Sequence, residues 1–433
     1  MAFPRYDSYK DSGVEWLGEI PSHWNLLRNK FLFQEKKETV GKKSGDFILL
    51  SLTLRGVIAR DMENPQGKFP AEFNTYKVVN PSNLIFCHFD IEETPRTVGY
   101  ASQKGMITGA YTVVECEKNI NSRYLYYYYL SLDFDKRLQP LYTGLRKVIK
   151  SDVFLGIKSP VPPLEDQNRI IEFLDRTTTE IDQAIAKKQR LIELLQEQKA
   201  ILINQAVTKG LNPNVPMRDS GIEWIGKIPE HWEIKKLKYI SKIKYGLGQP
   251  PREKENGLPL IRATNVERGK IVEKDLVRVD PDDIPYQRDP VLKTGDIVVV
   301  RSGAYTADSA IVTEKYSGSI AGYDMVLTAK RDVNPEYLAF CLLAKYVLYD
   351  QLYLLRMRAA QPHLNAEELG ETLIIIPPFD EQAKIILLLQ KLNQDQEVTF
   401  AITNREINLL NELKKLVIAN AVTGKLKVCD RTF

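Results

Sequence analysis

Residues 162–211 contain the pattern that most constrains how this chain can fold. Apolar residues recur there at alternating steps of three and four, which predicts a helix that packs along one stripe against another helix. Pro162-Pro163 before the pattern and Gly210 after it mark the expected ends of that helix. The stripe comprises Ile171, Leu174, Thr178, Ile181, Ile185, Lys188, Ile192, Leu195, Lys199, Leu202 and Ala206.

The chain also supplies a partner helix. Residues 377–426 repeat the pattern, and both copies end in the sequence Ala-Val-Thr. The stripe of the second copy comprises Ile386, Leu389, Asn393, Gln396, Phe400, Thr403, Ile407, Leu410, Lys414, Val417 and Ala421. We therefore expect two duplicated helices that pair as a coiled coil, with the stripe lysines pointing outward or setting the register.

A second repeat precedes each helix. Residues 12–24 have the sequence SGVEWLGEIPSHW, and residues 220–232 have the sequence SGIEWIGKIPEHW. Internal repeats of this kind indicate two tandem halves that share one scaffold. The predicted fold class is α+β, with two tandem α/β domains joined by the two long helices. Strands are expected at residues 47–52, 84–88, 258–263 and 297–301, helices at 122–132 and 335–349, and a linker at 210–220.

Length and composition bound the remaining possibilities. A chain of 433 residues is expected to form two or more domains, and it contains no run of 18 apolar residues that would span a membrane. The N-terminus lacks a hydrophobic signal core, and the four cysteines show no paired spacing, so a reducing cytoplasm is expected. The net charge of +4 neither requires nor excludes binding to nucleic acid.

Motifs for catalysis are incomplete. Residues 334–337 (Asn-Pro-Glu-Tyr) and 376–379 (Ile-Pro-Pro-Phe) each lack part of the D/N-P-P-Y/F pattern of DNA amino-methyltransferases. No phosphate-binding GxxxxGK[ST] sequence occurs, and the histidines and cysteines show no metal-ligand spacing. We expect no catalytic site and no metal site.

Taken together, the repeats resemble one known family. The twin openings, the twin helix starts PPLEDQ and PPFDEQ, and the twin ends AVTKGL and AVTGKL are similar to the specificity (S) subunits of type I restriction-modification systems. The resemblance covers almost the whole chain. It implies two target-recognition domains, each binding one part of a split double-stranded DNA site, and two conserved helices that pack antiparallel and set the spacing. The two halves would be related by a pseudo-two-fold axis.

The resemblance also implies domain boundaries and partners. The first recognition domain would cover residues 1–160 and the first helix 161–211; the second domain with its leading linker would cover 212–375 and the second helix 376–433. Expected partners are methyltransferase (M) subunits, two of them, and restriction (R) subunits. S-adenosylmethionine, ATP and Mg²⁺ would bind to those partners, and this chain would hold no cofactor. The assembled complex would be a site-specific deoxyribonuclease and an adenine-N6 DNA methyltransferase.

Candidates for DNA contact are polar residues in the segments that follow strands or precede the long helices, where side chains can extend to base edges. They are Arg55, His88, Arg96, Thr97, Arg146, Lys147, Arg262, Asn265, Arg301, Tyr305, Arg358 and Gln361. The twin tryptophans and the twin His23 and His231 could also stack on bases. We interpret them instead as packing residues, because they recur unchanged while two half-sites should differ. The tyrosine run Tyr124–Tyr129 is interpreted in the same way.

Two other functions remain open at this point. The paired modules could bind proteins rather than DNA and act as a scaffold, in which case the chain would show no salt-dependent binding to duplex DNA. A stand-alone DNA enzyme is the third possibility, and methylation by the purified chain without partners would favour it.

Overall fold

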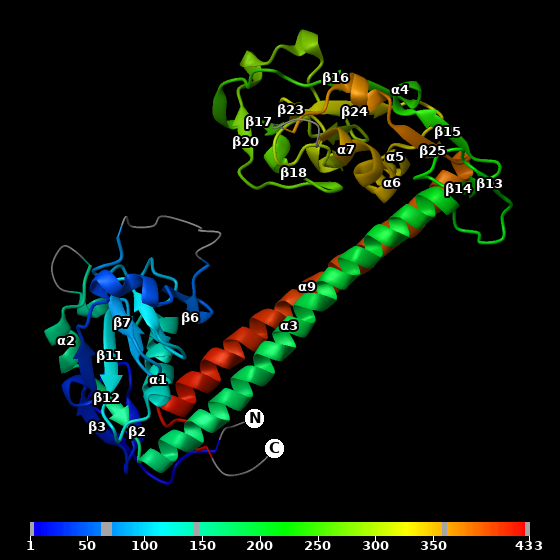
Figure 1. Ribbon diagram of the computed structural model, residues 1–433. Helices are drawn as coiled ribbons and strands as arrows, with labels where there is room; N and C mark the ends of the chain where they lie inside the picture. Colours follow the sequence, from blue (N-terminus) through cyan, green and yellow to red (C-terminus); the bar gives the residue numbers. More distant parts are fainter. Residues whose placement is uncertain (1–3, 62–71, 143–146, 357–361, 429–433) are drawn as a thin grey trace. The chain divides into compact units, whose positions relative to one another are not determined.

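The computed structural model describes residues 4–61, 72–142, 147–356 and 362–428 (Figure 1). The chain divides into two compact units, one formed by residues 1–188 with 404–433 and the other by residues 189–403. Each unit contains one α/β domain together with part of both long helices. This division falls within both long helices, so each helix is shared by the two units, and the predicted domain boundaries stay a prediction.

A four-stranded antiparallel sheet lies at the centre of the domain in unit 1, in the order β4-β11-β8-β9. The strands of this unit are β1 (Tyr9–Asp11), β2 (Glu19–Pro21), β3 (Asn25–Arg28), β4 (Phe33–Lys36), β5 (Leu50–Thr53), β6 (Gly56–Ala59), β7 (Lys77–Val79), β8 (Leu84–Phe86), β9 (Val98–Tyr100), β10 (Gly105–Ile107), β11 (Thr112–Cys116) and β12 (Lys158–Val161). Its shorter helices are α1 (Ser122–Phe134) and α2 (Ser151–Gly156). Helix α1 brings most of the tyrosine run into the core, as interpreted from the sequence.

Unit 2 repeats this sheet in the order β16-β24-β21-β22. Its strands are β13 (Met217–Asp219), β14 (Lys227–Pro229), β15 (Glu233–Lys236), β16 (Ser241–Tyr245), β17 (Glu253–Ile261), β18 (Val266–Glu267), β19 (Lys270–Ile271), β20 (Val277–Val279), β21 (Ile297–Val299), β22 (Ser309–Ile311), β23 (Ile320–Ala321), β24 (Met325–Ala329) and β25 (Leu373–Ile376). Its shorter helices are α4 (Leu237–Ile240), α5 (Pro335–Leu343), α6 (Lys345–Val347), α7 (Tyr353–Arg356) and α8 (Ala366–Gly370). The common strand order confirms the duplication inferred from the sequence.

Three expectations about local structure need correction. The helix predicted over residues 335–349 is broken: α5 and the following helical segment meet at an angle of 66°. Residues 47–52 become a strand only from Leu50 onward, because the preceding residues up to Asp46 form a 3-10 turn. The predicted linker contains strand β13, which pairs with β14.

The two long helices are α3 (Leu164–Lys209) and α9 (Phe379–Val422), which run side by side in Figure 1. Every position of both predicted stripes is buried or half-buried, so the 3.5-residue pattern identifies the contact surface correctly. In unit 1, Lys188 pairs with Glu406 at 2.7 Å, and Lys414 pairs with Asp182 at 2.6 Å. A higher residue number on one helix thus meets a lower one on the other, which makes the pair antiparallel.

Within the described residues, no single helix is both long and apolar enough to cross a membrane. One bent pair of helices, Pro335–Leu343 with Lys345–Leu355, has the length and apolar composition of a membrane span when the two are taken together. Most of its side chains are buried in the core of unit 2, as expected for the central helix of an α/β domain.

The repeated motifs build the same junction in both units. In unit 1, His23 lies 3.0 Å from Asp166 at the start of α3, and the side chain of the adjacent Gln167 accepts a 2.8 Å hydrogen bond from the backbone of Asn121. In unit 2, His231 lies 2.7 Å from Glu381 at the start of α9, and Gln382 accepts a 2.8 Å bond from the backbone of Asn334. Asn121 and Asn334 in turn cap helices α1 and α5.

The other end of each long helix packs on the same junctions. The hydroxyl of Tyr124 donates to the carbonyl of Val422 at the end of α9, and that of Tyr337 donates to Val207 near the end of α3. Each unit therefore holds the start of one long helix and the end of the other. This arrangement requires the two helices to be antiparallel.

Gly424 just beyond α9 is a sensitive point of this junction. Its φ is +74°, and a Cβ there would lie 2.2 Å from Pro21 Cδ and 3.2 Å from the ring of Trp24. Gly424→Ala combines left-handed strain with a steric clash, so we expect it to lower the free energy of unfolding by about 2–4 kcal/mol. Gly13→Ala is the control, because Gly13 also has a positive φ but a Cβ there would meet no atom within 4 Å. The control should cost only about 1–2 kcal/mol. Denaturant unfolding would measure both, and equal losses would contradict the packing argument.

Candidate nucleic-acid interface

In unit 2 a group of aromatic and basic side chains gathers at one edge of the central sheet. Strands β16 and β21 end at this edge and β24 begins there, because Tyr245 and Val299 both pair with Met325. Arg301 follows β21 by two residues. Its guanidinium carbon lies 4.6 Å from the ring centroid of Tyr245 and 4.0 Å from that of Tyr323. The guanidinium thus packs over two aromatic rings, an arrangement stabilised by cation–π attraction.

Asp324 fixes the backbone beneath this arginine. Its carboxylate is 3% exposed and accepts a 3.1 Å hydrogen bond from the backbone N–H of Arg301. Burial is the main cause that raises the pKa of Asp324 to about 6, and the charge of Arg301 partly opposes this shift. The chain also approaches itself closely here: a Cβ at Gly322 would lie 2.7 Å from the carbonyl oxygen of Ile261. Only glycine allows this approach.

The other described candidates in unit 2 differ in how far they are exposed to solvent. Tyr305 is exposed and follows Gly303, whose φ is +88°. Arg262 is half-buried and donates a 2.7 Å hydrogen bond to the carbonyl of Asp275. Asn265 is fully buried: its side chain accepts from the backbone of Arg262 and donates to two carbonyls of the following loop. The structure thus gives Asn265 a role in holding the loop, and it has no exposed surface for contact with a base.

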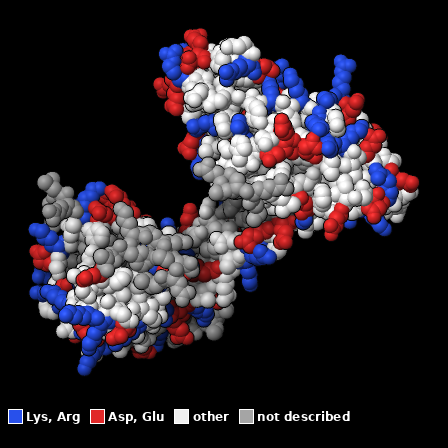
Figure 2. Space-filling model, turned by 45° about the horizontal axis from the view of Figure 1, so that its top comes forward, with Lys and Arg blue, Asp and Glu red and all other residues white. Residues whose placement is uncertain are grey.

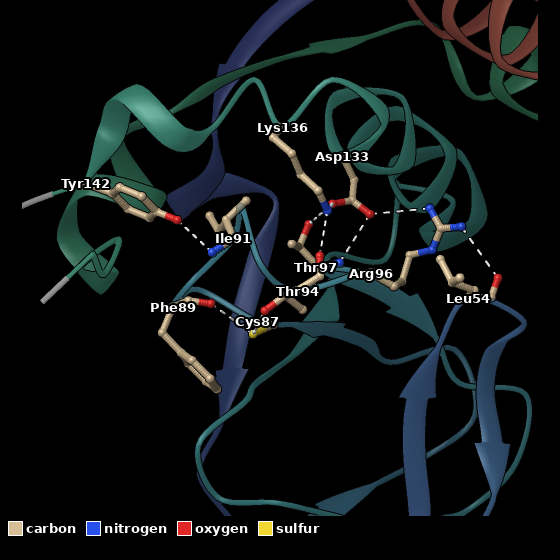
Figure 3. A network of polar contacts seen from close by, with 10 residues as sticks. All are labelled: Leu54, Cys87, Phe89, Ile91, Thr94, Arg96, Thr97, Asp133, Lys136 and Tyr142. Carbon is tan, nitrogen blue, oxygen red and sulfur yellow. Dashed lines mark hydrogen bonds and ion pairs between the residues drawn. The ribbon is translucent and has the colours of Figure 1, made fainter. Parts of the chain in front are cut away.

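Two candidates in unit 1 belong to a buried polar network (Figure 3). The carboxylate of Asp133 on α1 accepts hydrogen bonds from the hydroxyl of Thr97 at 2.6 Å and from the backbone N–H of Thr97 at 3.2 Å. It also accepts one from the ammonium group of Lys136 at 2.7 Å. The guanidinium of Arg96 donates a 3.3 Å hydrogen bond to the same carboxylate and a second hydrogen bond to the backbone carbonyl of Leu54. Removing Arg96 or Thr97 would leave the buried Asp133 carboxylate only partly compensated, so both residues contribute to the fold. Thr97, which is buried, is not accessible to a base in this conformation.

His88 is the residue of unit 1 that corresponds to Arg301. It is 8% exposed, and its Nδ1 lies 3.2 Å from the hydroxyl of Thr112. Its ring packs against Phe86 and Phe154. Burial, and to a lesser extent the charge of Lys77, lowers the pKa of His88 to about 4, so the ring is neutral at pH 7.

The remaining candidates lie on the surface or outside the described residues. Arg55 is exposed in the turn between β5 and β6. Lys147 is exposed and forms ion pairs with Glu92 at 3.2 Å and with Glu93 at 3.7 Å. Arg146, Arg358 and Gln361 lie outside the described residues. Contact of any of these candidates with DNA stays a prediction.

Tyr245 and Tyr323 were not among the predicted site residues, although they flank Arg301. Tyr323 follows a glycine that aligns between the halves, and Tyr245 ends a strand of alternating pattern. Their contact with Arg301 could not be inferred from the sequence. Tyr245 is 56 positions before Arg301, and the pairing of β16 and β21 with β24 brings the two side chains together.

The twin histidines and tryptophans behave mostly as packing residues. Trp24 and Trp232 are buried, and both histidines contact the acidic residue at the start of a long helix. Trp224 is an exception, being 49% exposed.

Charges are mixed on the face shown in Figure 2. Lys and Arg side chains alternate with Asp and Glu over each unit in that view, so neither unit shows a surface of a single sign there. In the part of the chain that the structure describes, no cluster of three or more His, Cys, Asp or Glu residues could hold a metal ion.

Comparison with known proteins identifies the family. The model described as the type I restriction modification DNA specificity domain matches residues 74–194 and 229–412, which is more than half of the chain. The chain belongs to this family. The resemblance inferred from the twin motifs is confirmed, and so is the predicted fold class.

Relatives of the family cover most of the chain. The type I restriction enzyme MjaVIII specificity subunit of Methanocaldococcus jannaschii is 26% identical over 342 residues, 77% of each chain. The EcoKI specificity subunit of Escherichia coli K12 is 22% identical over 323 residues, 72% of this chain and 68% of the relative.

Solved structures agree on the fold. One, from a study of complex assembly and conformational transition of the type I R-M system, has a TM-score of 0.69 at 14% identity and covers 94% of this chain and 99% of the other. The HsdS subunit of Thermoanaerobacter tengcongensis has a TM-score of 0.50 at 14% identity and covers 94% of this chain and 98% of the other.

The low pKa of His88 predicts a pH-dependent stability. Between pH 6.5 and 4 an unfolded histidine binds a proton that the native ring does not, so the folded state loses stability as pH falls. We expect a contribution of about 2 kcal/mol at pH 5 relative to pH 7.5. His88→Asn retains a polar atom near Thr112 but does not titrate. On going from pH 7.5 to pH 5, the wild type should therefore lose about 2 kcal/mol more unfolding free energy than the variant. A difference independent of pH would contradict the assignment.

Proposed function

We propose that this chain is the non-catalytic subunit that gives a type I restriction-modification complex its DNA specificity. It binds a bipartite double-stranded target, one part with each domain, and docks methyltransferase and restriction subunits. The observation that carries the proposal is the combination of one scaffold, present twice, with different side chains at the same sheet edge: neutral His88 in unit 1 and Arg301 in unit 2. Two similar domains with different edges are suited to two different half-sites.

The exposed face of α9 supports the docking of partners. Leu409, Leu413 and Leu416 are exposed in unit 1 and recur at steps of four and three, which places them on one helix face. The stripe that contacts α3, which includes Leu410 and Val417, is displaced from this face by roughly a third of a turn. In unit 2, Val398 and Ile402 are exposed on the same helix. Apolar residues left exposed in such an array mark a surface that a protein partner covers.

The chemistry of the complex would then belong to the partners. S-adenosylmethionine would bind to the methyltransferase subunits, and ATP with Mg²⁺ to the restriction subunits. The length of α3 supports a spacing role for the helices, since 46 residues at 1.5 Å per residue span about 69 Å.

Co-expression with its methyltransferase subunit, followed by genome-wide mapping of methylated adenines, tests the proposal. We expect a split motif, with two short specific parts separated by a gap of fixed length. Binding of the complex to duplex DNA should also weaken steeply as salt rises, because phosphate contacts release counterions. A stable complex that methylates no DNA would favour the alternative, a protein-interaction scaffold.

The docking face gives a separate prediction. Leu409→Lys combined with Leu413→Lys removes two apolar contacts, each worth roughly 1 kcal/mol or more, and should weaken methyltransferase binding at least about tenfold. The matched control is Asn404→Lys with Asn408→Lys, which adds the same charge at exposed positions displaced around the helix from the three leucines. Affinity can be measured by titrating the labelled chain with the methyltransferase subunit. Equal affinity of the two double variants would remove the leucine face from the docking surface.

A further inference from the structure

We infer that the second domain recognises a guanine in the major groove of its half-site through Arg301, with Tyr245 and Tyr323 holding the guanidinium in place. This inference rests on the proposed function and deepens it, because it names one base and the side chain that contacts it. The first domain, with His88 at the equivalent position, would recognise its half-site without an arginine at this point.

The equivalence of the two positions follows from strand register. In unit 1, Phe86 at the end of β8 pairs with Thr112 of β11, and His88 lies two residues beyond. In unit 2, Val299 at the end of β21 pairs with Met325 of β24, and Arg301 lies two residues beyond. The two side chains therefore leave the same edge of the same sheet in the two domains.

The guanidinium of Arg301 is held in place but keeps its hydrogen-bonding capacity. Among the described residues, none accepts a hydrogen bond from this guanidinium or forms an ion pair with it, and its Nε is buried without a partner. The two flanking rings, of Tyr245 and Tyr323, are 44% and 46% exposed, so the clamp lies at the surface. An arginine fork with free terminal N–H groups matches the O6 and N7 acceptors of guanine, which no other base pair presents in the major groove.

Clamping favours base recognition over phosphate contact. A phosphate needs only a positive charge within reach, and a flexible surface lysine or arginine supplies it. Two planar hydrogen bonds to one base edge require a fixed plane, and contact with two rings limits the rotation of the guanidinium. The backbone bond from Arg301 to buried Asp324 fixes the starting point of the side chain as well. Less conformational freedom is then lost on binding.

His88 cannot make this contact. The ring is buried beside Phe86 and Phe154, and its pKa of about 4 leaves it uncharged at neutral pH. Beside it, Phe89 stacks on Tyr111 with ring centroids 6.0 Å apart. The same edge thus presents a charged donor in unit 2 and an aromatic surface in unit 1.

The test uses the chain assembled with its methyltransferase subunit. Methylation mapping of the wild-type complex first defines the split motif, and a series of duplexes then changes one base pair of it at a time. We expect one guanine, in one part only, whose replacement by adenine weakens wild-type binding about 5- to 150-fold. The Arg301→Gln complex should lose its preference for the original duplex over the changed one, because a glutamine side chain pairs with adenine rather than guanine. It should keep full discrimination in the other part.

Two further variants keep the test decisive. Tyr323→Ala removes one wall of the clamp and should reduce discrimination at the same guanine. Arg288→Gln, at an exposed position elsewhere in unit 2, should leave discrimination unchanged. Were Arg301→Gln to fold poorly, Tyr323→Ala would still locate the affected base pair.

Three results separate the possible failures. Loss of affinity by Arg301→Gln that is uniform over all duplexes, with a smaller salt dependence, would mean a phosphate contact and would overturn the inference. Unchanged discrimination at every position in both Arg301→Gln and Tyr323→Ala would overturn it as well. A wild-type complex that has no split motif at all would instead be a failure of the proposed function.

Discussion

The packing of α3 against α9 is the interaction on which the rest of the structure depends. Neither helix buries enough apolar surface alone, and each packs its single stripe against the other. The ends of the helix pair pack into the domain cores. Ile171 and Leu174 belong to the core of unit 1, and Ile386 and Leu389 belong to the core of unit 2. Apolar packing therefore concentrates at the helix ends.

The middle of the pair is more polar, and it determines register more than stability. Gln396 is buried and donates a 2.8 Å hydrogen bond to the carbonyl of Leu195, while its own Oε1 has no partner among the described residues. A buried polar group of this kind costs stability but penalises shifted alignments. Burial also lowers the pKa of Lys199 on the same stripe. The exposed ion pairs of Lys188 and Lys414 add little energy each, but they favour the same alignment.

Much of this architecture could be predicted from the sequence, because repetition reveals what both halves need. The PPLEDQ and PPFDEQ motifs recur since their acidic and glutamine side chains bind the histidine and the helix cap of the adjacent domain. Predictions failed where a contact joins distant residues. Thr97 appeared to be a free loop residue, but its partner Asp133 lies 36 positions away on α1. The tyrosines around Arg301 were missed for the same reason, and the break after α5 has no proline or glycine to announce it.

The division between repeated and variable residues has a physical basis. Residues at the junctions of domain and helix each satisfy several partners, so a change there affects both the domain and the helix pair. Among the described residues, those just beyond β8 and β21 take part in fewer of these contacts. The backbone of Arg301 is fixed by Asp324, and its guanidinium packs against the rings of Tyr245 and Tyr323. At the corresponding place, His88 fills an aromatic pocket. One backbone framework thus tolerates a buried neutral ring or a half-buried cation at the same edge. A duplicated scaffold can in this way present two different surfaces without altering the helices that join them.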